Sequence, residues 1–186
     1  MDYYNNKSFK IIGVTNRKIS NNFYGRIEEI RNSKLDYLIL REKDLSHSSL
    51  LEMAIKINKI LDESKIKLII NTDIEVAKKI NAYGVQLSYK DFADGKRYEG
   101  INGVSIHSYD EAIKSEGLGA DYLIYGHIFK TDCKKGIEPR GLNEFKRICE
   151  NVKIPVYGIG GVNEKNYKLV ISSGASGIAI MSTLFK

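Results

Sequence analysis

Two histidines in this 186-residue chain directly follow short apolar runs, and their chemistry suits proton transfer. His127 comes after the run YLIYG, and His107 comes after NGVSI. An imidazole with an unperturbed pKa of about 6.5 can take up and release a proton near neutral pH. The alternative for each is a hydrogen-bonded structural histidine. We therefore treat His127 as the first candidate for a general acid or base and His107 as the second.

Glycines and a serine follow two later apolar runs, and they predict a phosphate site. Gly160 and Gly161 precede a helix-like segment, where backbone N–H groups and the positive end of a helix dipole attract phosphate. Met181 and Ser182 follow the last run, where a short final helix would offer further N–H groups. The alternative is an ordinary tight turn. We predict that these four residues bind phosphate together, mostly through the backbone.

Cations follow the second apolar run. Arg41 and Lys43 stand at its end and could hold a carboxylate or a phosphate. Composition alone favours a surface salt-bridge cluster of these two cations with Glu42 and Asp44.

A long polar loop follows the run that leads to His127. It extends from Phe129 to Arg140, and such length suggests a lid or a ligand-binding loop. Thr131 and Lys134 within it could contact an anion. The alternative is a solvated loop, which is usual for segments rich in lysine.

Predicted strands and helices alternate along the chain, and these elements must position the candidate residues. Eight apolar runs have the near-continuous Val/Ile/Leu/Tyr pattern of strands that are buried on both faces of a parallel sheet. They begin at Phe9, Tyr37, Lys67, Gly84, Asn102, Tyr122, Pro155 and Gly177. The segments between these runs have apolar residues at helical spacing, most clearly Leu50, Ala54, Ile57 and Leu61. Capping boxes are predicted at Ser49 with Glu52, Thr72 with Glu75, and Ser108 with Glu111.

Eight strand–helix units predict a closed (β/α)8 barrel, with an open doubly wound sheet as the second choice. Residues 1–186 are expected to form one domain, with the chemistry at the carboxyl ends of the strands. Because 186 residues is below the usual length of such barrels, about 200 or more, we expect the eighth helix to be absent or a single turn. We also expect a neighbouring subunit, in a homodimer, or residues 1–9 to cover the face that this leaves open.

Composition excludes several classes of protein. The net charge of +6 is spread without a run of five like charges, so we expect no nucleic-acid partner. No apolar run approaches the roughly 18 residues of a membrane span, and the first residues do not resemble a signal peptide. Two isolated cysteines fit a reducing cytoplasm, and no zinc motif is present.

Together these residues resemble the thiamine phosphate synthase superfamily, from about residue 11 to residue 185. The most specific stretch is YGHIFKTDCKKGIEPRGL, from Tyr125 to Leu142, and LREKD, IINTDIEVA, VSIHSYDEA and IPVYGIGGV are also similar. Within the superfamily the chain looks like the TenI-type thiazole tautomerases. Synthases have Gly-Pro where this chain has Gly126-His127. They also have a metal-binding aspartate at the position of Thr72.

The resemblance to the tautomerases implies an isomerase of thiamine thiazole biosynthesis without a cofactor. Its substrate would be a carboxylated thiazole phosphate tautomer, and His127 would move the proton that makes the ring aromatic. The phosphate would lie on Gly160, Gly161, Met181 and Ser182. The expected substrate pocket adds Arg41, Lys43, Asn71, Ser105, His107, Thr131 and Lys134.

Two alternatives remain open. The first is a thiamine phosphate synthase, which couples a pyrimidine pyrophosphate to a thiazole phosphate and needs Mg²⁺; Arg41, Lys43, Asn71 and Asp91 motivate it. The second is a ligand-sensing regulator without enzymatic activity, for which the positive charge is the sole support.

Overall fold

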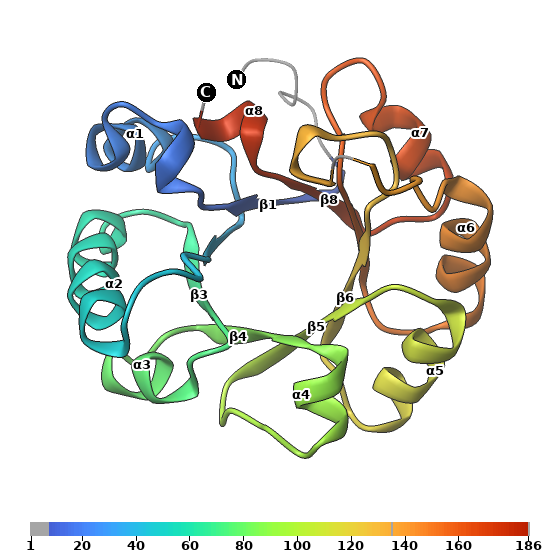
Figure 1. Ribbon diagram of the computed structural model, residues 1–186, viewed down its shortest axis with the longest axis horizontal. Coiled ribbons are helices and arrows are strands. Elements are labelled where there is room, and N and C mark those ends of the chain that lie inside the picture. The colour runs from blue at the N-terminus through green and yellow to red at the C-terminus, as the bar shows by residue number, and fades with distance from the viewer. Residues whose placement is uncertain (1–7, 135, 186) are drawn as a thin grey trace. The chain divides into compact units, whose positions relative to one another are not determined.

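The computed structural model describes residues 8–134 and 136–185. Its eight strands form a closed parallel barrel in sequence order, which confirms the predicted (β/α)8 fold against the open sheet. The strands are β1 (Lys10–Val14), β2 (Tyr37–Leu40), β3 (Lys67–Asn71), β4 (Gly84–Ser88), β5 (Ile101–Ile106), β6 (Tyr122–Gly126), β7 (Val156–Ile159) and β8 (Gly177–Ile180) (Figure 1).

Helices follow the strands, and the short 3-10 turns of the described residues lie in the loops. The helices are α1 (Phe23–Ile30), α2 (His47–Leu61), α3 (Ile74–Lys79), α4 (Tyr89–Ala93), α5 (Tyr109–Gly117), α6 (Leu142–Asn151), α7 (Tyr167–Ser172) and α8 (Ser182–Phe185), and the turns are η2 (Arg17–Ile19) and η3 (Asp132–Lys134). No helix in the described ranges is long and apolar enough to cross a membrane. The last helix is a single turn of four residues, as the length of the chain predicted.

Contacts between residues divide the chain into two compact units. Among the described residues, the first holds 8–86, 98–101 and 181–185, and the second holds 87–97, 102–134 and 136–180. The expectation of one domain over residues 1–186 stays a prediction.

The core of the first unit lies between its strands and α2. Strand β2 pairs in parallel with β1 and β3, with Leu38 opposite Gly13 on one side and Leu68 on the other. Helix α2 buries Leu50, Ala54, Ile57 and Leu61, which is the face that the helical spacing predicted.

Helix α8 packs against α1 and β1 within the first unit (Figure 1). The rings of Phe185 and Phe23 stack with centroids 5.5 Å apart, and Nε of Arg26 donates to the carbonyl oxygen of Leu184 at 2.6 Å. A Cβ at Gly13 would lie 2.7 Å from the Leu184 side chain. The final turn therefore supplies some cover near β1. A role for residues 1–7 in covering the barrel lies outside the described residues, and the homodimer stays a prediction.

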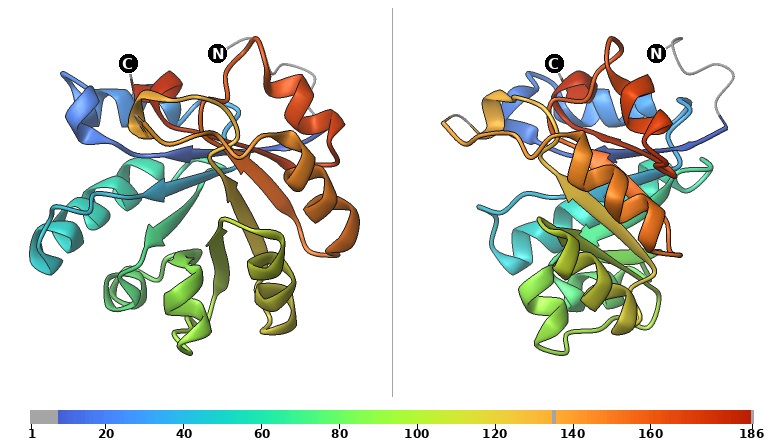
Figure 2. Two further views of the ribbon diagram at one scale, coloured as in Figure 1. Left: turned by 45° about the vertical axis from the view of Figure 1, so that its right-hand side comes forward. Right: turned by 90° about the vertical axis from the view of Figure 1, so that its right-hand side faces the viewer.

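The second unit is built on β6, β7 and β8, which pair in parallel (Figure 2). Helix α6 buries Phe145 and Ile148, and the Phe145 ring stacks on Tyr125 of β6 with centroids 5.6 Å apart. The Tyr125 hydroxyl donates to Oε2 of Glu144 at 2.8 Å. Burial, followed by that hydrogen bond, raises the Tyr125 pKa well above its usual value. These contacts fix α6 against β6, the strand that leads to His127.

Two of the predicted capping boxes are wrong and one start is confirmed. Helix α2 is capped by Ser46, whose Oγ accepts from the Ser49 N–H, so the observed cap lies three residues before the predicted one. Helix α3 is capped by Asp73, while Thr72 has φ +71° and does not cap it. In both places another capping residue stands close to the predicted one, and sequence alone does not rank them. Ser108 caps α5 as predicted.

Replacing Ser46 with alanine is expected to lower the free energy of unfolding by about 1 kcal/mol, because the first turn of α2 loses its side-chain acceptor. Ser49→Ala is the matched control and is expected to change stability by less than about 0.5 kcal/mol. Urea unfolding followed by circular dichroism measures both. A larger loss in Ser49→Ala than in Ser46→Ala would contradict the cap seen in the structure.

Candidate functional site

Three of the predicted pocket residues belong to the first unit and lie just after a strand or at its end. They are Arg41, Lys43 and Asn71. Arg41 and Lys43 follow β2, and Asn71 is the last residue of β3. The Asn71 Nδ2 donates to Oγ1 of Thr72 at 2.8 Å. All three side chains therefore stand at the carboxyl ends of parallel strands, where barrels of this type carry their chemistry.

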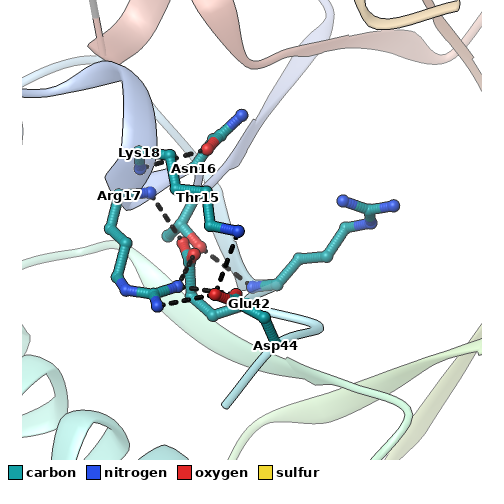
Figure 3. Close-up of polar contacts among 7 residues, drawn as sticks. Thr15, Asn16, Arg17, Lys18, Glu42 and Asp44 are labelled. Carbon is teal, nitrogen blue, oxygen red and sulfur yellow. Dashed lines mark hydrogen bonds and ion pairs between the residues drawn. The ribbon is translucent and has the colours of Figure 1, made fainter.

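The acidic neighbours of Arg41 and Lys43 do not pair with them, which corrects the expected salt-bridge cluster. Figure 3 shows Glu42 and Asp44 reaching instead to Arg17, in the turn after β1. Nη1 of Arg17 lies 3.0 Å from Oε2 of Glu42 and 2.7 Å from Oδ1 of Asp44. The hydrogen bonds to Asp44 and Glu42 raise the Arg17 pKa, and Arg17 followed by Lys18 holds the Asp44 pKa well below its usual range.

Arg17 is a residue that the sequence reasoning missed. It belongs to the polar sequence Thr15-Asn16-Arg17 directly after β1, the same kind of position as Arg41 after β2. Polarity at the carboxyl end of a parallel strand was the signal that would have identified it.

In the second unit, His127 lies directly after β6 and is buried, with 7% of its surface exposed. Its Nε2 is 3.2 Å from the carbonyl oxygen of Ile137, in the polar loop. A carbonyl oxygen can only accept, so Nε2 carries a hydrogen and, in the neutral ring, Nδ1 holds the lone pair. The backbone oxygen of His127 accepts from the Arg140 N–H, which ties both ends of the loop together.

Ser105 and His107 come from the neighbouring strand, β5. Ser105 is half-buried within the strand, and His107 is exposed directly after it. Nδ1 of His107 is 2.8 Å from the carbonyl oxygen of Gly126, the residue before His127. The structure thus brings both predicted histidines to adjacent strand ends of one unit and joins them through this carbonyl.

The loop after β6 contains Thr131 and Lys134. Oγ1 of Thr131 accepts from the Cys133 N–H at 3.4 Å, and the Thr131 carbonyl accepts from the Lys134 N–H at 3.1 Å. Lys134 is exposed. The loop holds itself by a local turn, so whether these side chains contact an anion stays a prediction.

Two cysteines differ in exposure, with Cys133 exposed in this loop and Cys149 half-buried in α6. Burial raises the Cys149 pKa to about 12. Because the thiolate is the reactive form, iodoacetamide at pH 8 is expected to modify Cys133 at least about tenfold faster than Cys149. Peptide mass spectrometry measures the rates, and labelling in denaturant is the control. Equal rates in the folded protein would contradict the prediction.

Gly160 and Gly161 follow β7 and adopt positive φ angles of 95° and 68°. A Cβ at Gly160 would lie 2.2 Å from Cβ of His127, and one at Gly161 would lie 2.6 Å from the carbonyl oxygen of Lys130. The chain after β7 therefore passes close to the loop after β6. This close approach explains the glycines without a ligand, and phosphate binding by them stays a prediction.

The other predicted phosphate residues belong to the first unit. Met181 follows β8, and its carbonyl accepts from the N–H groups of Leu184 and Phe185. Ser182 is the first residue of α8. That Met181 and Ser182 bind one phosphate together with Gly160 and Gly161 stays a prediction.

The chain is similar to known proteins over nearly its whole length. The chain is 41% identical over 184 residues to a protein of Clostridium acetobutylicum named thiamine-phosphate synthase, with 95% of this chain and 87% of the relative covered. It is 34% identical to a putative thiamine-phosphate synthase 2 of Aquifex aeolicus, with 93% and 96% covered.

A solved structure is also similar. The thiamine phosphate pyrophosphorylase of Pyrococcus furiosus superposes with a TM-score of 0.80 at 28% identity, covering 94% of this chain and 86% of that one. Residues 11–184 match the family described as thiamine monophosphate synthase. A match of this extent, with relatives above 30% identity over nearly the whole chain, shows that the chain belongs to the thiamine monophosphate synthase family.

Proposed function

We propose that this chain is an enzyme of thiamine biosynthesis that acts on a thiazole phosphate. Membership of the family and the names of its relatives support this assignment. The cations after β2 and the glycines after β7 suit an anionic, phosphorylated substrate. A regulatory role gains no support from these comparisons.

The names of the relatives favour one reaction, the synthase reaction that was the alternative from sequence. In it a pyrimidine pyrophosphate is coupled to the thiazole phosphate, and thiamine phosphate is the product. The observation that carries this candidate is the 41% identity to a protein named thiamine-phosphate synthase. The names of these relatives support the synthase reaction better than they support an isomerisation.

The residues present do not fit the magnesium ion that synthases use. Thr72 offers a hydroxyl where the resemblance places a carboxylate, and that hydroxyl accepts from Asn71. Asp91 is held by Nζ of Lys96 and by Oγ of Ser88, each at 2.6 Å. The hydrogen bond from Lys96, followed by that from Ser88, lowers the Asp91 pKa.

A second candidate is the thiazole tautomerase, which is favoured by His127 at the end of β6. In this reaction neutral His127 removes the proton on C2 of the ring, and the electrons of that bond enter the ring. The imidazolium then gives a proton to the exocyclic carbon, and the thiazole becomes aromatic. Atoms balance without a cofactor, since the base is regenerated. The Nε2–H bond to Ile137 supports this role because it leaves the lone pair on Nδ1.

Two assays on the full chain decide between the reactions. One supplies the pyrimidine pyrophosphate, thiazole phosphate and Mg²⁺, and measures thiamine phosphate. The other supplies the carboxythiazole phosphate tautomer with EDTA, and measures the aromatic product. Thiamine phosphate supports the synthase, and aromatisation in EDTA supports the tautomerase. No product in either assay at high enzyme concentration would overturn the proposed function.

A further inference from the structure

The guanidinium of Arg17 lies between two carboxylates that follow β2 (Figure 3). Nη1 and Nη2 hold the two oxygens of Asp44 at 2.7 and 2.8 Å, and Nη1 also holds Oε2 of Glu42 at 3.0 Å. The Arg17 backbone N–H donates to the other oxygen of Glu42, at 3.0 Å. The Glu42 side chain is 3% exposed, so this carboxylate is desolvated and depends on its partner.

Backbone contacts fix the two loops to each other at the same place. The buried Thr15 accepts at Oγ1 from the Arg41 N–H at 2.9 Å, and its own N–H donates to the carbonyl of Ile39 at 2.9 Å. The start of the segment after β2 is therefore set by the segment after β1. Residues 42 and 44 turn their side chains to Arg17 while the backbone at residue 41 is held.

This arrangement leaves Arg41 and Lys43, the two cations of the segment after β2, without acidic partners among the described residues. Asp44 is shared between Arg17 and Lys18, whose Nζ lies 3.0 Å from Oδ2. Among the described residues, the side chains of Arg41 and Lys43 make no ion pair. Two positive charges that alternate in sequence with two neutralised carboxylates suit the binding of an anion of two or more charges.

We propose that Arg17 is a positioning residue for anion binding: it draws Glu42 and Asp44 away from Arg41 and Lys43, so that these cations are available to the substrate. The proposal rests on the proposed function for the identity of the ligand, an anion such as a phosphate, pyrophosphate or carboxylate. Without Arg17, the two carboxylates would compete for the same cations. Arg17 itself needs no contact with the ligand.

Inorganic pyrophosphate is the probe, and isothermal titration calorimetry on the full chain measures its dissociation constant. Arg17→Met is expected to weaken binding by roughly tenfold, the effect of one charge-assisted interaction. In the triple variant R17M/E42Q/D44N, the competing carboxylates are neutral, and binding is expected to return to within about threefold of wild type. A merely structural role for Arg17 would not be rescued in this way.

Arg31→Met is the matched control, because Arg31 pairs with Glu63 on the surface in the same unit. Its pyrophosphate affinity is expected to equal that of wild type. If Arg17→Met does not fold, E42Q/D44N retains Arg17 and is expected to bind as tightly as wild type or more tightly. A glutamine oxygen at position 42 still accepts the Arg17 N–H.

Four results would overturn the inference. These are absence of pyrophosphate binding by wild type, unchanged binding by Arg17→Met, failure of the triple variant to recover, and weaker binding by E42Q/D44N. The inference and the proposed function can also fail separately. If the variants bind pyrophosphate as expected but the protein gives no product in either activity assay, the inference is supported and the proposed function is contradicted.

Discussion

Replacing His127 with asparagine is expected to slow aromatisation of the carboxythiazole phosphate tautomer by about 10²- to 10⁴-fold, the usual contribution of a general acid–base group. Asparagine removes the proton carrier, but its amide reaches only as far as Nδ1 of histidine, so the hydrogen bond of Nε2 to the Ile137 carbonyl is lost as well. Ultraviolet absorbance of the aromatic product measures the rate. Circular dichroism and the melting temperature establish that the variant is folded.

His47→Asn is the matched control for this experiment. His47 begins α2, and its Nδ1 lies 2.8 Å from Oδ2 of Asp73, outside the predicted substrate pocket. Its rate is expected to stay within about twofold of wild type. A near-normal rate in His127→Asn would remove the tautomerase candidate and leave the synthase candidate standing.

Gly160→Ala is expected to lower the free energy of unfolding by about 2–5 kcal/mol. Two costs combine there: about 1–2 kcal/mol for the left-handed backbone and about 1–3 kcal/mol for overpacking. The new Cβ would meet Cβ of His127 at 2.2 Å and its Cα at 2.7 Å, so the clash falls on fixed backbone and not on a flexible side chain. Differential scanning calorimetry is expected to show a melting temperature lower by roughly 5–15 °C.

Gly119→Ala separates these two costs. Gly119 has a similar φ of 85°, but a Cβ there meets nothing within 4 Å. It is expected to cost about 1–2 kcal/mol, the backbone part alone. Equal losses in the two variants would show that the approach of Gly160 to His127 is not a tight contact.

The sequence by itself predicted the barrel, because strands buried on both faces are continuous apolar runs that can be read locally. The face of α2 from Leu50 to Leu61 followed from helical spacing in the same way. The length of the chain predicted an eighth helix that is absent or a single turn, and the structure has the single turn Ser182–Phe185. His127 was placed correctly at the end of β6 because a polar residue after a buried strand stands out.

Only the tertiary structure decided which charges meet. Glu42 and Asp44 lie beside Arg41 and Lys43 in sequence, yet they pair with Arg17, about 25 residues earlier. Parallel pairing of β1 with β2 brings those loops together, and the backbone N–H of Arg17 also donates to the Glu42 carboxylate. The caps at Ser46 and Asp73 were decided similarly, by which of several nearby polar residues has the right backbone geometry. The sequence of a segment shows which charged and capping residues it contains. The partners of these residues depend on which strand lies next to the segment in the fold.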